Sequence, residues 1–292
     1  MVSKEIITNI IEKSYIAIKC KVNRIGNNSL SNQIKHTLNN FAEKTKNNKI
    51  EQGLIIGNNG QELEWSDGTY ENVGYDEDTV KKALDNNDGK DLHFEHNHVG
   101  SFIDKEKKFD EMIQLNMPTM LSLPDVDTLF EHMNYNGQEV IPFKSITADS
   151  TNGTRMTLTR IDKDGEDLTN NHVLKNISDS KYDVHEAWKN MYSRWATFFN
   201  QYNNNLKVFN ANWMNGERYQ QSMREWNESS QTEEDRKRIF QDGFWRAYYR
   251  ERDKFAKQMV KENFEEDVMK DSVKEFEKVG FELSLEWRGE YK

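Results

Sequence analysis

The sequence predicts an α/β (α+β) domain with a mixed sheet and flanking helices, followed by a mainly α-helical C-terminal domain. Two observations support this fold class. Residues 48–165 alternate short apolar runs with turn signals and one helical pattern, which is typical of a layered α/β domain. Residues 183–280 carry aromatic side chains at three- and four-residue steps, which indicates helices. We place the segments at 1–47, 48–165 and 180–292.

The bulk composition limits the classes of function. The chain has 292 residues and a formal net charge of −10, so as a whole it repels nucleic acid, and we expect no nucleic-acid partner. Cys20 is the only cysteine, so no disulfide can form within the chain. No apolar run approaches the length of a membrane span. These features favour a cytoplasmic protein that does not bind a membrane.

The N-terminal segment predicts a helical hairpin. Isoleucines and a tyrosine recur at largely helical spacing over residues 3–22. Asn27-Asn28-Ser29 then breaks the pattern before a second helix around Ile34, Leu38 and Phe41. Both apolar faces are narrow, so we expect this hairpin to pack beside the sheet.

The next segment predicts a strand hairpin, a helix and a further strand. Residues 50–57 and 61–65 read as two strands joined by the turn Asn58-Asn59-Gly60. Residues 76–86 have the pattern of an amphipathic helix. An extended segment follows over residues 92–100.

A helix and two more strands complete the predicted α/β domain. Ser122 and the proline that follows it stand where a helix start is expected, so we predict a helix over 124–134. Residues 139–147 and 154–161 read as a pair of strands. The second strand alternates in a way that predicts one side exposed to solvent.

The C-terminal segment predicts helices with an aromatic core, including one over 236–257. We place the boundary before it near 165–180, where the chain is polar. The aromatic series is Trp188, Tyr192, Trp195 and Phe199, then Phe240, Phe244, Tyr248 and Phe255. Bulky rings at helical spacing ordinarily form a core. We also expect a protein partner, if there is one, to bind this segment.

Two histidines in the extended segment 92–100 predict a metal site. His96 and His98 are spaced i, i+2, so in a strand they project from the same face and can bind one metal ion. Two histidines and one carboxylate leave a zinc ion a fourth position for water, which is the arrangement of a hydrolytic site. His93 and Glu95 lie on the opposite face of that strand.

The third ligand is expected from the helix start after Ser122. Asp125 lies in the first turn of that helix, where packing and the helix N-terminus can aim it back at the strand end. Asp104, Asp110 and Asp127 are alternatives for this ligand. His132 is expected to be structural.

The order of these features resembles the JAMM (MPN) metalloprotease family over roughly residues 48–162. The chain has a glutamate at the start of a strand hairpin, then a helix, then His-x-His on a strand, then Ser-x-x-Asp at a helix start. The RadC-like and phage-associated branches are the most similar. The resemblance implies that His96, His98 and Asp125 bind Zn²⁺, that Glu51 is the general base, and that Ser122 stabilises the oxyanion.

The activity implied by the resemblance is zinc-dependent hydrolysis of a peptide or isopeptide bond in a protein or peptide substrate. The sequence departs from the family pattern at Val99, where a proline is usual, and in the longer separation of His98 from Asp125. Residues 100–121 would form an inserted helix or lid there. The alternative is a catalytically degenerate JAMM-like scaffold, a phage-associated structural or interaction protein that would be virion-associated if phage-encoded.

The tripeptide His96-Asn97-His98 does not indicate an HNH nuclease. Such nucleases are named for residues scattered across a ββα unit, not for a contiguous tripeptide, and this segment has no basic groove in its sequence.

Overall fold

A mixed sheet with helices on its two faces is the main feature of the structure, a computed structural model that describes residues 23–69, 73–98, 118–150, 153–161, 171–217, 219–221, 224 and 246–287. Within these residues, seven strands form one sheet. The predicted α+β fold class is therefore confirmed. The helix predicted over residues 3–22 lies outside the described residues.

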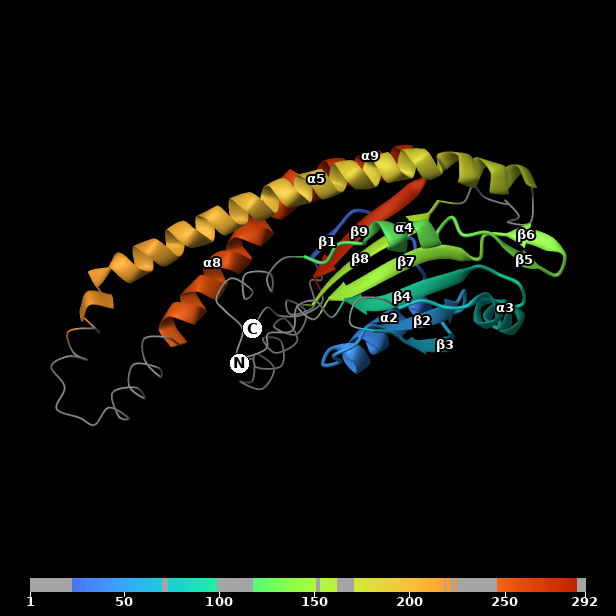
Figure 1. Ribbon diagram of the computed structural model, residues 1–292, viewed down its shortest axis with the longest axis horizontal. Helices are drawn as coiled ribbons and strands as arrows, with labels where there is room; N and C mark the ends of the chain where they lie inside the picture. The colour runs from blue at the N-terminus through green and yellow to red at the C-terminus, as the bar shows by residue number, and fades with distance from the viewer. Residues whose placement is uncertain are drawn as a thin grey trace, which may run out of the picture. The chain divides into compact units, whose positions relative to one another are not determined.

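The sheet contains both parallel and antiparallel pairs (Figure 1). In spatial order its strands are β1 (Asn23–Ile25), β9 (Phe281–Trp287), β8 (Thr154–Arg160), β7 (Phe143–Ser150), β4 (Leu92–His98), β2 (Gln52–Gly57) and β3 (Glu62–Asp67). Among the described strands of this sheet, only β4 and β7 pair in parallel. A separate two-stranded sheet is formed by β5 (Met133–Tyr135) and β6 (Gln138–Val140).

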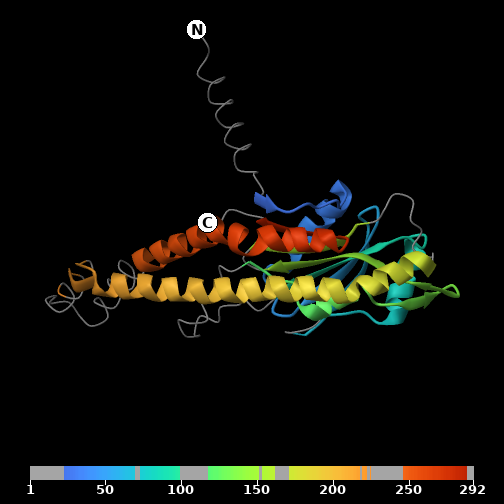
Figure 2. The same cartoon turned by 90° about the horizontal axis from the view of Figure 1, so that it is seen from above.

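The described helices differ widely in length. They are α2 (Asn32–Thr45), α3 (Glu77–Asn86), α4 (Leu123–Thr128), α5 (Asn171–Asn215), α8 (Arg246–Phe264), the π-helical turn η3 (Glu265–Met269) and α9 (Lys270–Lys278). The longest, α5, is a single helix of 45 residues (Figure 2). Side chains cap the first two: Ser31 accepts a hydrogen bond from the backbone of Ile34, and Asp76 accepts one from that of Thr79.

The local sequence signals located most of the elements that surround the predicted site. The strand hairpin is β2 and β3, the predicted helix over 76–86 is α3, and the segment with the two histidines is β4. The second helix of the predicted N-terminal hairpin is α2. The helix predicted over 236–257 is described only from residue 246, where α8 begins.

The region after Ser122 differs from the prediction. The helix expected over 124–134 ends at Thr128, and a short hairpin follows it. Asn136 and Gly137 both have positive φ, 53° and 80°, as a two-residue type I′ hairpin turn requires. Pro142 then separates β6 from β7, so the strand predicted over 139–147 is two strands.

The prediction that one side of β8 is exposed to solvent is wrong, because every residue of this strand is buried. Its polar face is buried around Arg155, whose guanidinium binds both carboxylate oxygens of Asp149 at 2.9 and 2.7 Å. The same guanidinium donates to the Leu38 carbonyl at 2.7 Å and the Asn39 side chain at 2.9 Å. A buried charge is tolerated when it is paired and hydrogen-bonded in this way.

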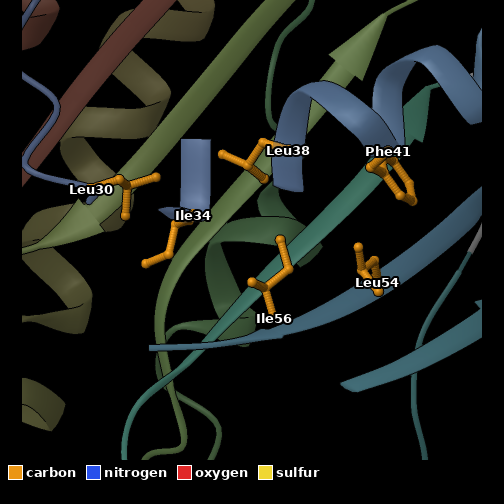
Figure 3. Close-up of a cluster of buried hydrophobic side chains, with 6 residues drawn as sticks. All are labelled: Leu30, Ile34, Leu38, Phe41, Leu54 and Ile56. Carbon is orange, nitrogen blue, oxygen red and sulfur yellow. The ribbon is translucent and has the colours of Figure 1, made fainter. Parts of the chain in front are cut away.

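Helix α2 covers the face of the sheet opposite to the two histidines of the predicted site. Its apolar side packs onto β2 in a buried cluster that Figure 3 shows, formed by Leu30, Ile34, Leu38, Phe41, Leu54 and Ile56. Leu54 pairs with Glu95 and Ile56 with His93 across β2 and β4, so these residues share one face. Phe94, His96 and His98 alternate with these residues along β4 and so project to the other face.

The sheet draws on chain segments outside residues 48–165. Strand β1 precedes them, and β9 follows them and pairs with both β1 and β8. The described chain divides into two compact units: one holds the sheet, α2 to α4, α5 up to Ala187 and the chain from Val273, and the other holds α5 from Trp188 and the chain up to Ser272. The division at residues 47, 165 and 180 stays a prediction.

We predict that Asp149→Ala lowers the free energy of unfolding by about 3–5 kcal/mol, because it leaves the buried charge of Arg155 without its carboxylate partner. Denaturant unfolding followed by circular dichroism measures this change. Glu43→Ala is the matched control, since it removes a carboxylate from an exposed ion pair with Lys46 and is expected to change stability little. Equal effects of the two substitutions would contradict the prediction.

Candidate metal centre

Strand β4 brings the two histidines to one face at its C-terminal end. It pairs in parallel with β7, where Ala148 is opposite His96 and Ser150 is opposite His98. On its other side it pairs antiparallel with β2, where Gly53 is opposite His96. Successive strand residues face opposite sides, so Asn97 between the histidines projects away from them.

The N-terminal cap of helix α4 positions the carboxylate of Asp125. The Ser122 hydroxyl accepts a hydrogen bond from the Asp125 backbone at 3.2 Å, and the Asp125 carboxylate accepts one from the Ser122 backbone at 2.6 Å. This reciprocal arrangement is a capping box, which satisfies two backbone N–H groups at the helix start. It fixes the rotamer of Asp125, and the side chain then reaches the two imidazoles.

The three side chains converge on one point. The Nε2 atoms of His96 and His98 are 2.9 Å apart, and carboxylate oxygens of Asp125 lie 3.3 Å from the first and 3.6 Å from the second. Bonds of about 2.0–2.2 Å to zinc would separate the ligands of a tetrahedral site by about 3.3–3.6 Å. The two distances to Asp125 match these values and the distance between the Nε2 atoms is shorter, so this group could hold a metal ion.

The surroundings of the group suit a cation. His96 is buried and His98 is partly exposed. Burial raises the pKa of Asp125, but the electrostatic interaction with His96 and hydrogen bonds from both imidazoles hold it well below its usual range. The carboxylate is therefore ionised and ready to act as a ligand. Nδ1 of His98 lies 3.1 Å from the Thr119 hydroxyl, which leaves Nε2 for the metal.

The two residues predicted to carry the chemistry line the same cavity as the three ligands. Glu51 and Ser122 both lie on the wall of a cavity of about 580 Å³ that also includes His96, His98 and Asp125. Glu51 is only 9% exposed and lies two residues before Gly53. Continuing the register of β2 and β4 places it opposite His98.

Asn97, for which no role was predicted, holds the backbone on both sides of Glu51. Its carboxamide accepts a hydrogen bond from the Gln52 backbone at 2.6 Å and donates one to the Ile50 carbonyl at 3.4 Å. The Glu51 backbone is held from the opposite side by Thr69 and Gly68. The sequence does indicate this role, because an asparagine between two histidines that face the site must point to the opposite face of the strand, which is buried.

Asp127, the one alternative candidate for the third ligand among the described residues, does not join this group. Asp127 binds Lys181 at 2.7 Å and His185 at 2.8 Å, both from the start of α5, so it ties α4 to that helix. Asp104 and Asp110 lie outside the described residues.

His132 and His93 take part in other contacts. His132 lies 2.8 Å from a carboxylate oxygen of Glu139 and 2.7 Å from the hydroxyl of Ser178, which fits the structural role expected for it. His93 lies on the reverse face of β4, 2.7 Å from the Ser145 hydroxyl.

Comparison with models of protein families, with curated protein sequences and with solved structures found no match to this chain. Among the described residues, no helix is long and apolar enough to cross a membrane.

We predict that Asp125→Asn weakens zinc binding by at least about a hundredfold, since losing even a residue that only supports a ligand costs about 10–100-fold. Competition with a chromophoric chelator, on protein without a histidine tag, measures the affinity. Asp127→Asn is the matched control and should retain it, because Asp127 contacts Lys181 and His185 instead. Loss of zinc in the control, with retention in Asp125→Asn, would move the third ligand to Asp127.

We predict that Asn97→Ala retains zinc affinity within a few-fold but lowers the free energy of unfolding by about 1–3 kcal/mol, because the backbone groups that it pairs lose their partner. Chelator competition and denaturant unfolding on the same preparation separate the two effects. A loss of zinc as large as that in Asp125→Asn would show that Asn97 supports the ligands themselves.

Proposed function

We propose that this protein is a zinc-dependent peptidase or isopeptidase of the JAMM type. One observation carries the proposal: His96, His98 and Asp125 converge at metal-ligand spacing in a cavity that Glu51 and Ser122 also line. Three protein ligands of the nitrogen and oxygen type, with a fourth position open, are typical of catalytic zinc sites. The sequence resemblance assigns the same five residues to the same chemistry.

A zinc ion held by His96, His98 and Asp125 would supply Lewis acidity for a carbonyl group and a water nucleophile near neutral pH. Glu51 would accept a proton from the attacking water and pass it to the leaving amine, which is general acid–base catalysis. Its carboxylate is buried at the cavity wall, and Asn97 holds the backbone on either side of it.

Ser122 is suited to stabilise developing negative charge on the scissile carbonyl oxygen. Its hydroxyl oxygen already accepts a hydrogen bond from the Asp125 backbone, so the hydroxyl hydrogen is free to be donated elsewhere. A donor held in place by a helix cap requires little reorganisation when charge develops.

The test is cleavage of peptide and lysine-branched isopeptide libraries by zinc-loaded protein, read by mass spectrometry. We predict that Glu51→Gln lowers the cleavage rate by about 10²–10⁴-fold while zinc content is unchanged, since a general base contributes a factor of that order. Ser122→Ala should lower it by about 10²–10³-fold.

Glu62→Gln is the control, because Glu62 lies on β3 and binds Lys44 away from the cavity. Cleavage that survives Glu51→Gln would refute the role of the base. No cleavage of either library by zinc-loaded protein would favour the degenerate scaffold.

A further inference from the structure

The cavity that holds the candidate metal site has a second, apolar part. Beside the five site residues, its wall includes the side chains of Val73, Tyr75, Val80, Phe94 and Phe143. Its volume, about 580 Å³, lies within the range of pockets that hold small ligands. The cavity therefore has room for a group at the metal site and for a further side chain beside it.

The apolar wall begins directly beside the ligands. Phe94 precedes His96 by two residues on the same face of β4, and the two rings stack with centroids 5.4 Å apart. The ring centroids of Phe143 and Phe94 are 5.9 Å apart, and Tyr75 packs edge-to-face with Phe94 at a centroid distance of 5.4 Å. A chain of rings thus leads away from the metal position.

This wall is preformed. Phe94, Phe143 and Val80 are each less than 8% exposed. Gly53 leaves room for the rings of Phe94 and Tyr75 to lie against the strand, because a Cβ atom at this position would lie 3.0 Å from Phe94 and 3.1 Å from Tyr75. The Tyr75 hydroxyl donates to the Glu64 carbonyl at 3.2 Å, so its polar atom already has a partner. Binding would therefore require little reordering of these side chains.

The charge of the cavity selects against acidic groups. Its described lining contains three carboxylates, those of Glu51, Asp125 and Glu131, and neither lysine nor arginine. A bound divalent metal would offset this charge at the ligand end only. An acidic substrate side chain placed against the apolar wall would lose its hydration without gaining a cationic partner from the described lining.

We propose that this apolar part is a specificity pocket that takes one large, uncharged apolar side chain of the substrate beside the bond that is cut. This inference rests on the proposed function, since the metal site orients the substrate. Val80 and Val73 border the pocket from α3 and from the segment before it, so larger residues at these positions would fill it.

The test compares two probes that share one metal-binding group, acetohydroxamic acid and 3-phenylpropionohydroxamic acid, by calorimetry on the zinc-loaded full chain. The phenyl probe is expected to bind at least about tenfold more tightly, because it buries a ring that acetohydroxamic acid lacks. Val80→Phe and Val73→Phe should each remove this advantage and leave acetohydroxamic acid binding unchanged. Val73 is partly exposed, so its variant guards against a failure of Val80→Phe to fold.

Two outcomes overturn the inference while the metal site stands: acetohydroxamic acid binds but the phenyl group adds nothing, or the phenyl advantage persists in both variants. Failure of zinc, or of both probes, to bind overturns the proposed function and this inference with it. Tighter binding of succinic acid monohydroxamate than of acetohydroxamic acid would contradict the selection against acidic groups.

Discussion

The parallel pairing of β4 with β7 is the constraint on which the candidate site depends. Parallel neighbours cannot be joined by a tight turn, so the chain must cross over between them, and α4 lies in that connection. The crossover returns Asp125 to the end of β4 that carries His96 and His98. The antiparallel partner β2 begins at the same end, which places Glu51 there. One strand end thus gathers residues from three distant parts of the sequence.

The two faces of β4 make different contacts. One face carries Phe94, His96 and His98 into the cavity. The reverse face is buried and polar, with His93 bound to Ser145 and Asn97 bound to the backbone of β2 and of Ile50. A register slip of one residue would exchange these faces and destroy both sets of contacts. The hydrogen bonds of the reverse face therefore help to specify the register that the metal site needs.

Local signals explain how far the sequence could predict this architecture. A turn rich in asparagine and glycine, alternating apolar residues and a serine at a helix start each act over a few residues, so β2, β3, β4 and the α4 cap were predictable. Two elements that were not predicted carry the same kinds of signal. Asn136-Gly137 marks the hairpin after α4, and Phe281–Trp287 alternates as a strand behind a long helical pattern.

Other features depend on contacts between distant segments, which no local pattern shows. The burial of Arg155 requires Asp149 from the neighbouring strand and α2 from more than a hundred residues earlier. The sequence could name His96, His98 and Asp125 as candidate ligands, but it left three other aspartates open. The hydrogen bonds of the α4 cap, the short distances from Asp125 to both imidazoles, and the contacts of Asp127 with α5 distinguish the two aspartates.

The most direct test of the metal site is an anomalous difference map from crystals of the zinc-loaded protein, recorded at the zinc edge. We predict one peak about 2.0–2.2 Å from Nε2 of His96, Nε2 of His98 and a carboxylate oxygen of Asp125, with no fourth protein ligand. A peak bound elsewhere, a fourth side chain in the remaining position, or no peak at this site would contradict it.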